Sequence, residues 1–157
     1  MEMSALGHKR TVTIDRCLGD VTTWRYTTVL AAERGRDLMN TQQLAKTFTD
    51  MCAKGEFEAA GKKFWSDDIE SREPMTGEMA VLKGRKAVEG KGEWWKANHE
   101  VHSFKVGGPY VHGDQFVVRF EGEVTPKGQK RMHLDEVGLY TVRNGKIVEE
   151  SFFMGGA

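Results

Sequence analysis

The C-terminal part of the chain constrains the fold most, because it reads as strands joined by tight turns. Apolar and polar side chains alternate along Gln115–Val124, and Asn144–Gly145 separates Gln129–Arg143 from Lys146–Met154. An Asn-Gly pair between two such runs favours a two-residue hairpin. Together with an expected strand over Val101–Val106, these segments predict an antiparallel meander.

Helical patterning is confined to the region before this meander. Apolar side chains recur there at helical spacing, and Gly55 is suited to end the first helix in a left-handed conformation. Helices separated in sequence from an antiparallel sheet indicate the α+β class. Helices are expected over residues 40–54, 56–64 and 84–99, with a short strand at 69–73 and a loop at 75–83.

The first 38 residues differ from the rest of the chain. Residues 1–38 show neither a sustained two-residue nor a sustained 3.6-residue period. We expect them to form a poorly ordered leader, and the coherent pattern that begins at Met39 favours that methionine as the native start. Residues 39–157 are then expected to form one ordinary domain.

The composition argues against several classes of function. Lys and Arg total 23, as do Asp and Glu, so the chain lacks the basic excess typical of nucleic-acid binders. No apolar run has the length of a membrane-spanning helix. Cys17 and Cys52 have no Cys or His partners at metal-binding spacing, so they read as free thiols of a reducing compartment. We therefore expect a cytoplasmic protein that binds neither nucleic acid nor membrane.

Alternation along the strands predicts one largely apolar sheet face. This face carries one acidic side chain, that of Glu136, and a buried carboxyl is costly unless it is paired, protonated or solvated. A shift of register by one residue would turn Glu136 outward to water, and the pattern alone leaves both orientations open. The other members of the face are Phe116, Val118, Phe120, Met132, Leu134, Gly138 and Tyr140.

Three stretches resemble the NTF2-like superfamily and, within it, the SnoaL-like (polyketide cyclase-like) proteins. They read FTDMCAKGEFEAAGKKFWSDDIESREP, KGRKAVEGKGEWWKANHEVHSF and GLYTVRNGKIVEESFFMGG, and the resemblance covers about residues 40–155. It implies an α+β cone, in which three N-terminal helices pack on a strongly curved, mostly antiparallel sheet around an apolar pocket. It also implies a homodimer formed through the outer sheet face, which carries Val117, Val137 and Leu139.

A more distant resemblance to ketosteroid isomerase suggests roles for two carboxyls. The base of that enzyme lies in a stretch that is similar to SDDIESREP, which places Glu73 at the base position. Its acidic hydrogen-bond donor lies on the penultimate strand, where Glu136 falls, and this favours the inward orientation of Glu136. Its first-helix tyrosine matches Phe48, which has no hydroxyl, and this departure argues against steroid isomerase activity itself.

The resemblance thus implies a cofactor-independent isomerase or cyclase that acts on a small apolar carbonyl compound, with no metal. Glu73 is the expected base and Glu136 the expected acid. The alternation also predicts that Glu150 points inward. Further residues expected to line the substrate site are Trp95, His99, Phe116, Val118, Phe120, Leu134, Tyr140, Glu150 and Phe152.

Two other functions stay open on the sequence. A non-catalytic module that binds a hydrophobic ligand, or a dimeric accessory domain, would fit the missing hydroxyl at Phe48. In that case Glu73 would be an exposed residue paired with Arg72 or Arg85. An epoxide hydrolase of the same fold would need an arginine in the pocket, whereas Arg119 is expected to face outward.

Overall fold

The computed structural model describes residues 39–155, and the expected leader at 1–38 lies outside the described residues. The elements confirm the α+β class, and their order places three helices and two short strands before a long meander. The helices are α1 (Thr41–Ala53), α2 (Phe57–Phe64) and α3 (Arg85–Asn98). The strands are β1 (Trp65–Arg72), β2 (Val81–Lys83), β3 (His99–His112), β4 (Gln115–Pro126), β5 (Met132–Arg143) and β6 (Lys146–Met154).

The strands form one mixed sheet in the order β2-β1-β6-β5-β4-β3. Strands β3 to β6 are the predicted antiparallel meander, whereas β1 runs parallel to β6 and pairs with β2 at the edge. The hairpin between β5 and β6 turns at Asn144 and Gly145, whose φ angles are 51° and 70°. Positive φ at both positions is what a tight two-residue hairpin requires, so this prediction is confirmed.

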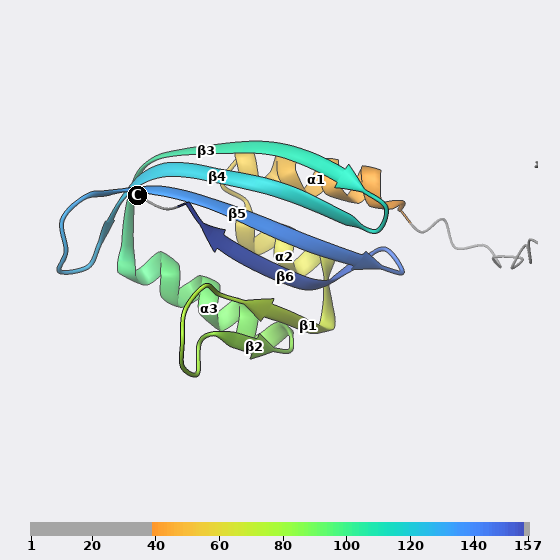
Figure 1. The fold of residues 1–157 in the computed structure, drawn as a ribbon, viewed down its shortest axis with the longest axis horizontal. Helices are drawn as coiled ribbons and strands as arrows, with labels where there is room; N and C mark the ends of the chain where they lie inside the picture. The colour runs from red at the N-terminus through yellow and green to blue at the C-terminus, as the bar shows by residue number, and fades with distance from the viewer. Residues whose placement is uncertain (1–38, 156–157) are drawn as a thin grey trace, which may run out of the picture. The chain divides into compact units, whose positions relative to one another are not determined.

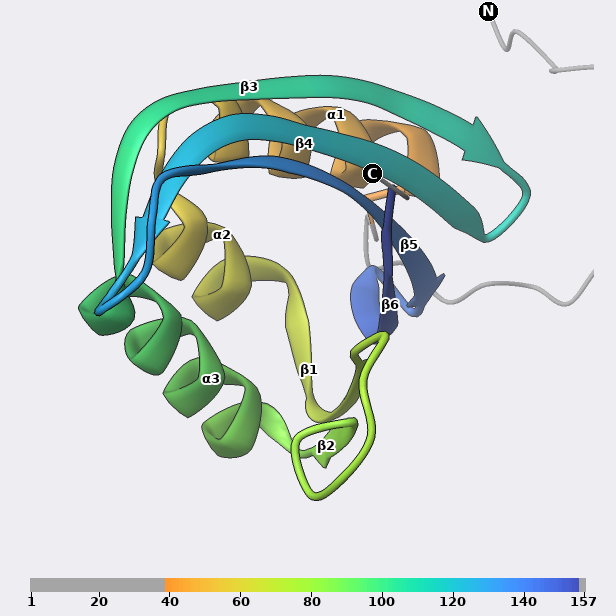
Figure 2. The same cartoon turned by 60° about the vertical axis from the view of Figure 1, so that its left-hand side comes forward.

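The long strands curve around the helices. Figure 2 shows β3, β4 and β5 arching over α1 and α2, while Figure 1 shows the same strands along their length. Helix α1 packs against β3 and β4, and α3 packs against β1. The helices therefore lie on the concave face of the curved sheet, as the family resemblance implied.

The start of α1 follows from its capping residues. The side chain of Asn40 accepts a hydrogen bond from the Gln43 amide at 2.9 Å, and the Gln43 side chain accepts one from the Asn40 amide at 3.3 Å. This capping box satisfies two amides that the helix leaves free. Past the other end, Gly55 has a φ of 78°, which confirms the predicted left-handed residue.

The core lies between α1 and the middle of the sheet. Phe48 packs its ring against Tyr140 and Phe116, with ring centroids 4.9 and 5.8 Å away. Most residues of the predicted apolar face are buried: Phe116, Val118, Phe120, Leu134, Gly138 and Tyr140. The outward orientation predicted for Arg119 is also confirmed, since its side chain is 47% exposed and forms two hydrogen bonds with Asp135.

Several predicted boundaries were wrong. Strand β1 begins at Trp65 rather than at residue 69, because Trp65 pairs with Ile147 of β6 across the sheet. Residues 81–83 were expected in a loop, yet they pair with β1. Strand β3 continues through Gly107–Pro109, where an irregularity in its pairing with β4 accommodates the proline. Finally, β5 begins at Met132 rather than at residue 129.

Candidate functional site

Lys91 lies at the centre of a cluster of polar side chains between α3, β1 and β6. Its Nζ atom is 2.6 Å from Glu73 Oε1 and 3.1 Å from Glu150 Oε1, and it donates a hydrogen bond to Ser71 Oγ at 2.7 Å. Burial alone would lower the pKa of Lys91, but Glu150 and Glu73 outweigh this effect and raise it. The lysine is therefore charged at neutral pH.

Glu150 is the most buried charged member of this cluster, with 2% of its surface exposed. Its carboxylate accepts hydrogen bonds from Ser71 Oγ at 2.8 Å and from Trp65 Nε1 at 3.1 Å, besides the bond from Lys91. Three donors compensate for the loss of water around a buried charge. The neighbouring Glu149 points to the other face of β6 and pairs with Arg72, so the alternation predicted the inward member correctly.

Glu136 lies on β5, opposite Phe120 of β4 and Met154 of β6. Its side chain forms no hydrogen bond or ion pair with any residue between 39 and 155. Burial, followed by repulsion from Glu73 and Glu150, raises its pKa to about 7, although Lys91 partly opposes this change. The structure thus brings an unpaired carboxyl that titrates near neutrality close to the Lys91 cluster.

Aromatic rings adjoin the cluster. The Nζ atom of Lys91 lies over the ring of Phe152, 4.4 Å from its centroid, and Phe152 meets Tyr140 edge to face at 6.2 Å. Burial, followed by the charge of Glu150, raises the pKa of Tyr140 well above its usual value. The same two causes raise the pKa of the Cys52 thiol to about 12, so both side chains are neutral at physiological pH.

The remaining residues expected to line a substrate site form no hydrogen bond or ion pair with Lys91, Glu73 or Glu150. Phe116, Val118 and Phe120 belong to the packed core, and Leu134 is 8% exposed. Trp95 and His99 stack on each other with ring centroids 4.6 Å apart, and His99 Nδ1 is 2.9 Å from the Trp95 carbonyl oxygen. His99 directly follows the last residue of α3, so it lies at the opposite end of that helix from Arg85.

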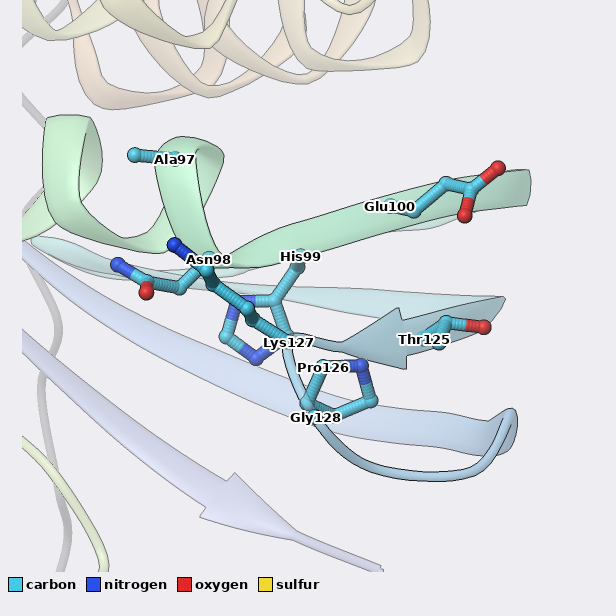
Figure 3. A pocket seen from close by; sticks show the side chains of 8 residues that line it. All are labelled: Ala97, Asn98, His99, Glu100, Thr125, Pro126, Lys127 and Gly128. Atoms are coloured by element: carbon cyan, nitrogen blue, oxygen red, sulfur yellow. The ribbon is translucent and has the colours of Figure 1, made fainter.

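A hollow of about 340 Å³ lies at the junction of α3 and β3 with the turn after β4. Its lining residues, shown in Figure 3, are Ala97, Asn98, His99, Glu100, Thr125, Pro126, Lys127 and Gly128. His99 is the one predicted site residue among them, and the hollow shares no residue with the Lys91 cluster. We place the candidate site at the cluster, because largely buried titratable groups converge there.

Sequence reasoning missed Lys91, Ser71 and Trp65. A signal for Lys91 was present, since it follows Val88 by three residues and precedes Trp95 by four, on the apolar stripe of α3. The partners proposed for Glu73 as an exposed residue were wrong. Arg72 pairs with Glu70 and Glu149, and Arg85 pairs with Asp67.

Two classes of feature have no representative in the described part of the chain. Between residues 39 and 155, no three His, Cys, Asp or Glu side chains are arranged to hold a metal ion. No helix in the same range is both long and apolar enough to cross a membrane.

Comparison with known proteins identifies the relatives of this chain. Residues 39–154 match the model of the SnoaL-like domain. A solved structure from Mesorhizobium loti is 51% identical, with a TM-score of 0.71, and the match covers 73% of this chain and 99% of that one. It is named as a candidate SnoaL-like polyketide cyclase, with carbohydrate phosphatase added in brackets. No curated protein matches the chain.

More distant structures share the fold alone. A candidate isomerase from Bacillus subtilis is 14% identical with a TM-score of 0.60, over 74% of this chain and 90% of that one. A protein with a ketosteroid isomerase-like fold from Catenulispora acidiphila, in complex with trimethylamine, is 19% identical with a TM-score of 0.56. That match covers 73% of this chain and 86% of the other.

Proposed function

The chain belongs to the family of SnoaL-like domains, and on this premise we propose that it is a cofactor-independent isomerase or cyclase for an apolar carbonyl compound. One observation carries the proposal. Glu136, a carboxyl with a pKa of about 7 and no partner between residues 39 and 155, lies close enough to the Glu73–Lys91 ion pair to be affected by both charges. Glu136 has no partner in this range, whereas Glu73 is paired with a lysine. Two carboxyls with such different surroundings can divide the roles of acid and base.

The reaction would begin with the transfer of a proton from carbon to Glu73. The bond between hydrogen and the carbon next to the carbonyl breaks, the proton binds a Glu73 oxygen, and the electron pair moves to the carbonyl oxygen. Protonated Glu136 donates a hydrogen bond to that oxygen as its charge develops. In an isomerase, Glu73 returns the proton to a different carbon. In a cyclase, the enolate carbon attacks a second carbonyl carbon and closes a ring, the π pair of that carbonyl moves to its oxygen, and this oxygen takes the proton from Glu73.

The exposures of Glu73 and Glu150 favour Glu73 as the base. The side chain of Glu73 is 18% exposed, so it is accessible from outside, whereas that of Glu150 is 3% exposed. Apolar neighbours such as Phe152 and Leu134 would hold an apolar substrate and exclude water from the enolate.

Exchange of hydrogen for deuterium tests the first step without knowledge of the natural substrate. 2-Tetralone, an apolar bicyclic ketone, exchanges the protons next to its carbonyl when a base removes them, and proton NMR in D2O measures the rate. We expect the wild-type chain to accelerate this exchange, and Glu73→Gln and Glu136→Leu, which removes the hydrogen-bond donor, to lose at least about 100-fold of the acceleration. Glu149→Gln, on the opposite face of β6, is the matched control and should keep it.

Equal exchange by the wild type and by both Glu73→Gln and Glu136→Leu would refute the proposed chemistry. A second function, a module that binds a hydrophobic ligand without turnover, is favoured by the packing around Phe48. Its ring packs against both Tyr140 and Phe116 and brings no hydroxyl to the site. Saturable binding of 2-tetralone without accelerated exchange would support this module instead.

We also propose that the chain forms a homodimer through the outer sheet face. Val117, Val137 and Leu139 are half-buried there, and Phe153, opposite Val137, is 53% exposed. An exposed aromatic ring beside aliphatic side chains is typical of an interface between protein chains.

A further inference from the structure

We infer that Lys91 is a positioning residue, which holds the carboxylate of Glu73 in place and leaves no hydrogen free to bind substrate. The inference rests on the proposed function, because it assigns Glu73 the role of the base. It adds a residue that was not among those predicted from the sequence, and it restricts the class of substrate.

The ammonium group of Lys91 has as many acceptors around it as it has hydrogens. A lysine ammonium has three hydrogens, and Lys91 Nζ has three acceptors within hydrogen-bond distance. These are Glu73 Oε1 at 2.6 Å, Ser71 Oγ at 2.7 Å and Glu150 Oε1 at 3.1 Å. The ring of Phe152, 4.4 Å away, covers a further side of the group. A substrate oxygen would have to displace one of these protein acceptors.

Two of the three acceptors lie in a buried part of the molecule. Ser71 and Glu150 are 0% and 2% exposed, and Ser71 Oγ donates a hydrogen bond to Glu150 Oε1 at 2.8 Å. Trp65 donates a further hydrogen bond to the second oxygen of Glu150. Lys91 is thus anchored from β1 and β6, and its third hydrogen fixes the more accessible carboxylate of Glu73.

This arrangement determines which substrates the site can accept. The charged groups that act on Glu136 are Glu73, Glu150 and Lys91, and the two carboxylates outnumber the one cation. Because all the ammonium hydrogens are engaged, the cluster offers an anionic substrate a negative field and no free donor from Lys91. The site therefore selects uncharged carbonyl compounds and rejects carboxylates of the same shape.

The binding arm of the test compares two naphthalene ligands by calorimetry, and it does not depend on turnover. We expect 2-acetylnaphthalene, which is neutral, to bind the wild type at least about tenfold more tightly than 2-naphthoate. We expect that Lys91→Met also binds 2-naphthoate more weakly than it binds 2-acetylnaphthalene. Equal or tighter binding of 2-naphthoate to the wild type, lost in Lys91→Met, would show that Lys91 binds substrate and would overturn the inference.

The kinetic arm measures 2-tetralone exchange in Lys91→Met and in Glu150→Gln. We expect each to lower kcat roughly 10- to 100-fold with little change in KM, because a misplaced base affects turnover more than binding. The double variant should be no slower than the worse single variant, because both residues act through Glu73. Lys96→Met, exposed on the same helix, and Glu149→Gln are the matched controls.

The two arms separate the failure of this inference from that of the proposed function. Exchange that persists in Glu73→Gln refutes the proposed base. Loss of exchange in Glu73→Gln, with wild-type kcat in folded Lys91→Met and Glu150→Gln, refutes only the positioning role. Because Lys91→Met removes a buried charge, its fold is checked by circular dichroism, and Glu150→Gln tests the same chain of contacts independently.

Discussion

The ring of Tyr140 lies against Gly138 so closely that a Cβ atom on this glycine would be 2.8 Å from the Tyr140 hydroxyl oxygen. Two ring carbons of Tyr140 would be 2.9 and 3.0 Å from the same Cβ atom. The ring also stacks on Phe116, with centroids 4.8 Å apart. A glycine in the middle of β5 thus makes room for the ring that joins the core to the candidate site.

Gly138→Ala is expected to destabilise the protein, because the tyrosine ring must move away from the new methyl group, and this movement disturbs its stacking on Phe116. Overpacking of this kind costs about 2 kcal/mol. Urea unfolding followed by circular dichroism measures the change. Gly90→Ala on α3, where an added Cβ meets nothing within 4 Å, is the matched control and should stabilise the protein by up to about 1 kcal/mol. Equal stability of Gly138→Ala and the wild type would contradict the proposed crowding.

Glu136 is expected to make stability depend on pH. Its pKa is about 7 in the folded protein against an ordinary value of 4.5, so the folded state binds the proton more tightly than the unfolded state. The resulting stabilisation is fully present below pH 4.5 and is lost as the pH rises through 7. Relative to the wild type, Glu136→Gln should therefore gain up to about 3 kcal/mol between pH 4 and pH 8.

Urea unfolding of both proteins at several pH values measures this difference. Glu93→Gln, at an exposed position on α3, serves as the control and should follow the wild type across the range. If Glu136→Gln also ran parallel to the wild type, Glu136 would titrate at its ordinary pKa and could not be the proposed acid at neutral pH.

Ser71→Ala is expected to weaken the anchor beneath Lys91. The substitution removes a hydrogen bond to the buried Glu150 carboxylate and an acceptor for the lysine, at a cost of about 2 kcal/mol. Ser103→Ala, exposed on β3, should change stability by less than about 0.5 kcal/mol. Thermal and urea unfolding measure both variants, and equal effects at the two serines would show that the network contributes nothing to stability.

Phe153→Asp is expected to dissociate the proposed homodimer, because it places a charge among the apolar side chains of the outer sheet face. Size-exclusion chromatography with light scattering measures the mass. Met75→Asp, on the loop after β1, removes a similarly exposed apolar side chain, 56% against 53%, and should leave the dimer intact. The proposed interface would be contradicted if the wild type were a monomer in solution, or if Phe153→Asp had the same mass in solution as a dimeric wild type.

Local patterns predicted most of the elements because the interactions that form them are local. The Asn144–Gly145 turn depends on the backbone preferences of two adjacent residues, and the Asn40 cap depends on contacts within one helical turn. Strand β1 was harder to predict. Ser66, Asp67 and Asp68 have low strand propensity, and their extended conformation comes from their place between Trp65 and Ile69 on a strand that pairs with β6.

The candidate site likewise combines features that depend on local backbone geometry with features that depend on tertiary contacts. The sequence by itself determined which residues share a sheet face, because alternation along a strand depends on backbone geometry alone. It indicated Glu150 as an inward carboxyl, whereas it left the orientation of Glu136 open and only the family resemblance favoured the inward one. Only the tertiary structure decided that Glu73 pairs with Lys91, 18 residues away, and that Lys91 also reaches Glu150, 59 residues away. Ion pairs and shifts in pKa depend on distances of a few ångströms and on burial, and both are set by how α3, β1 and β6 pack together.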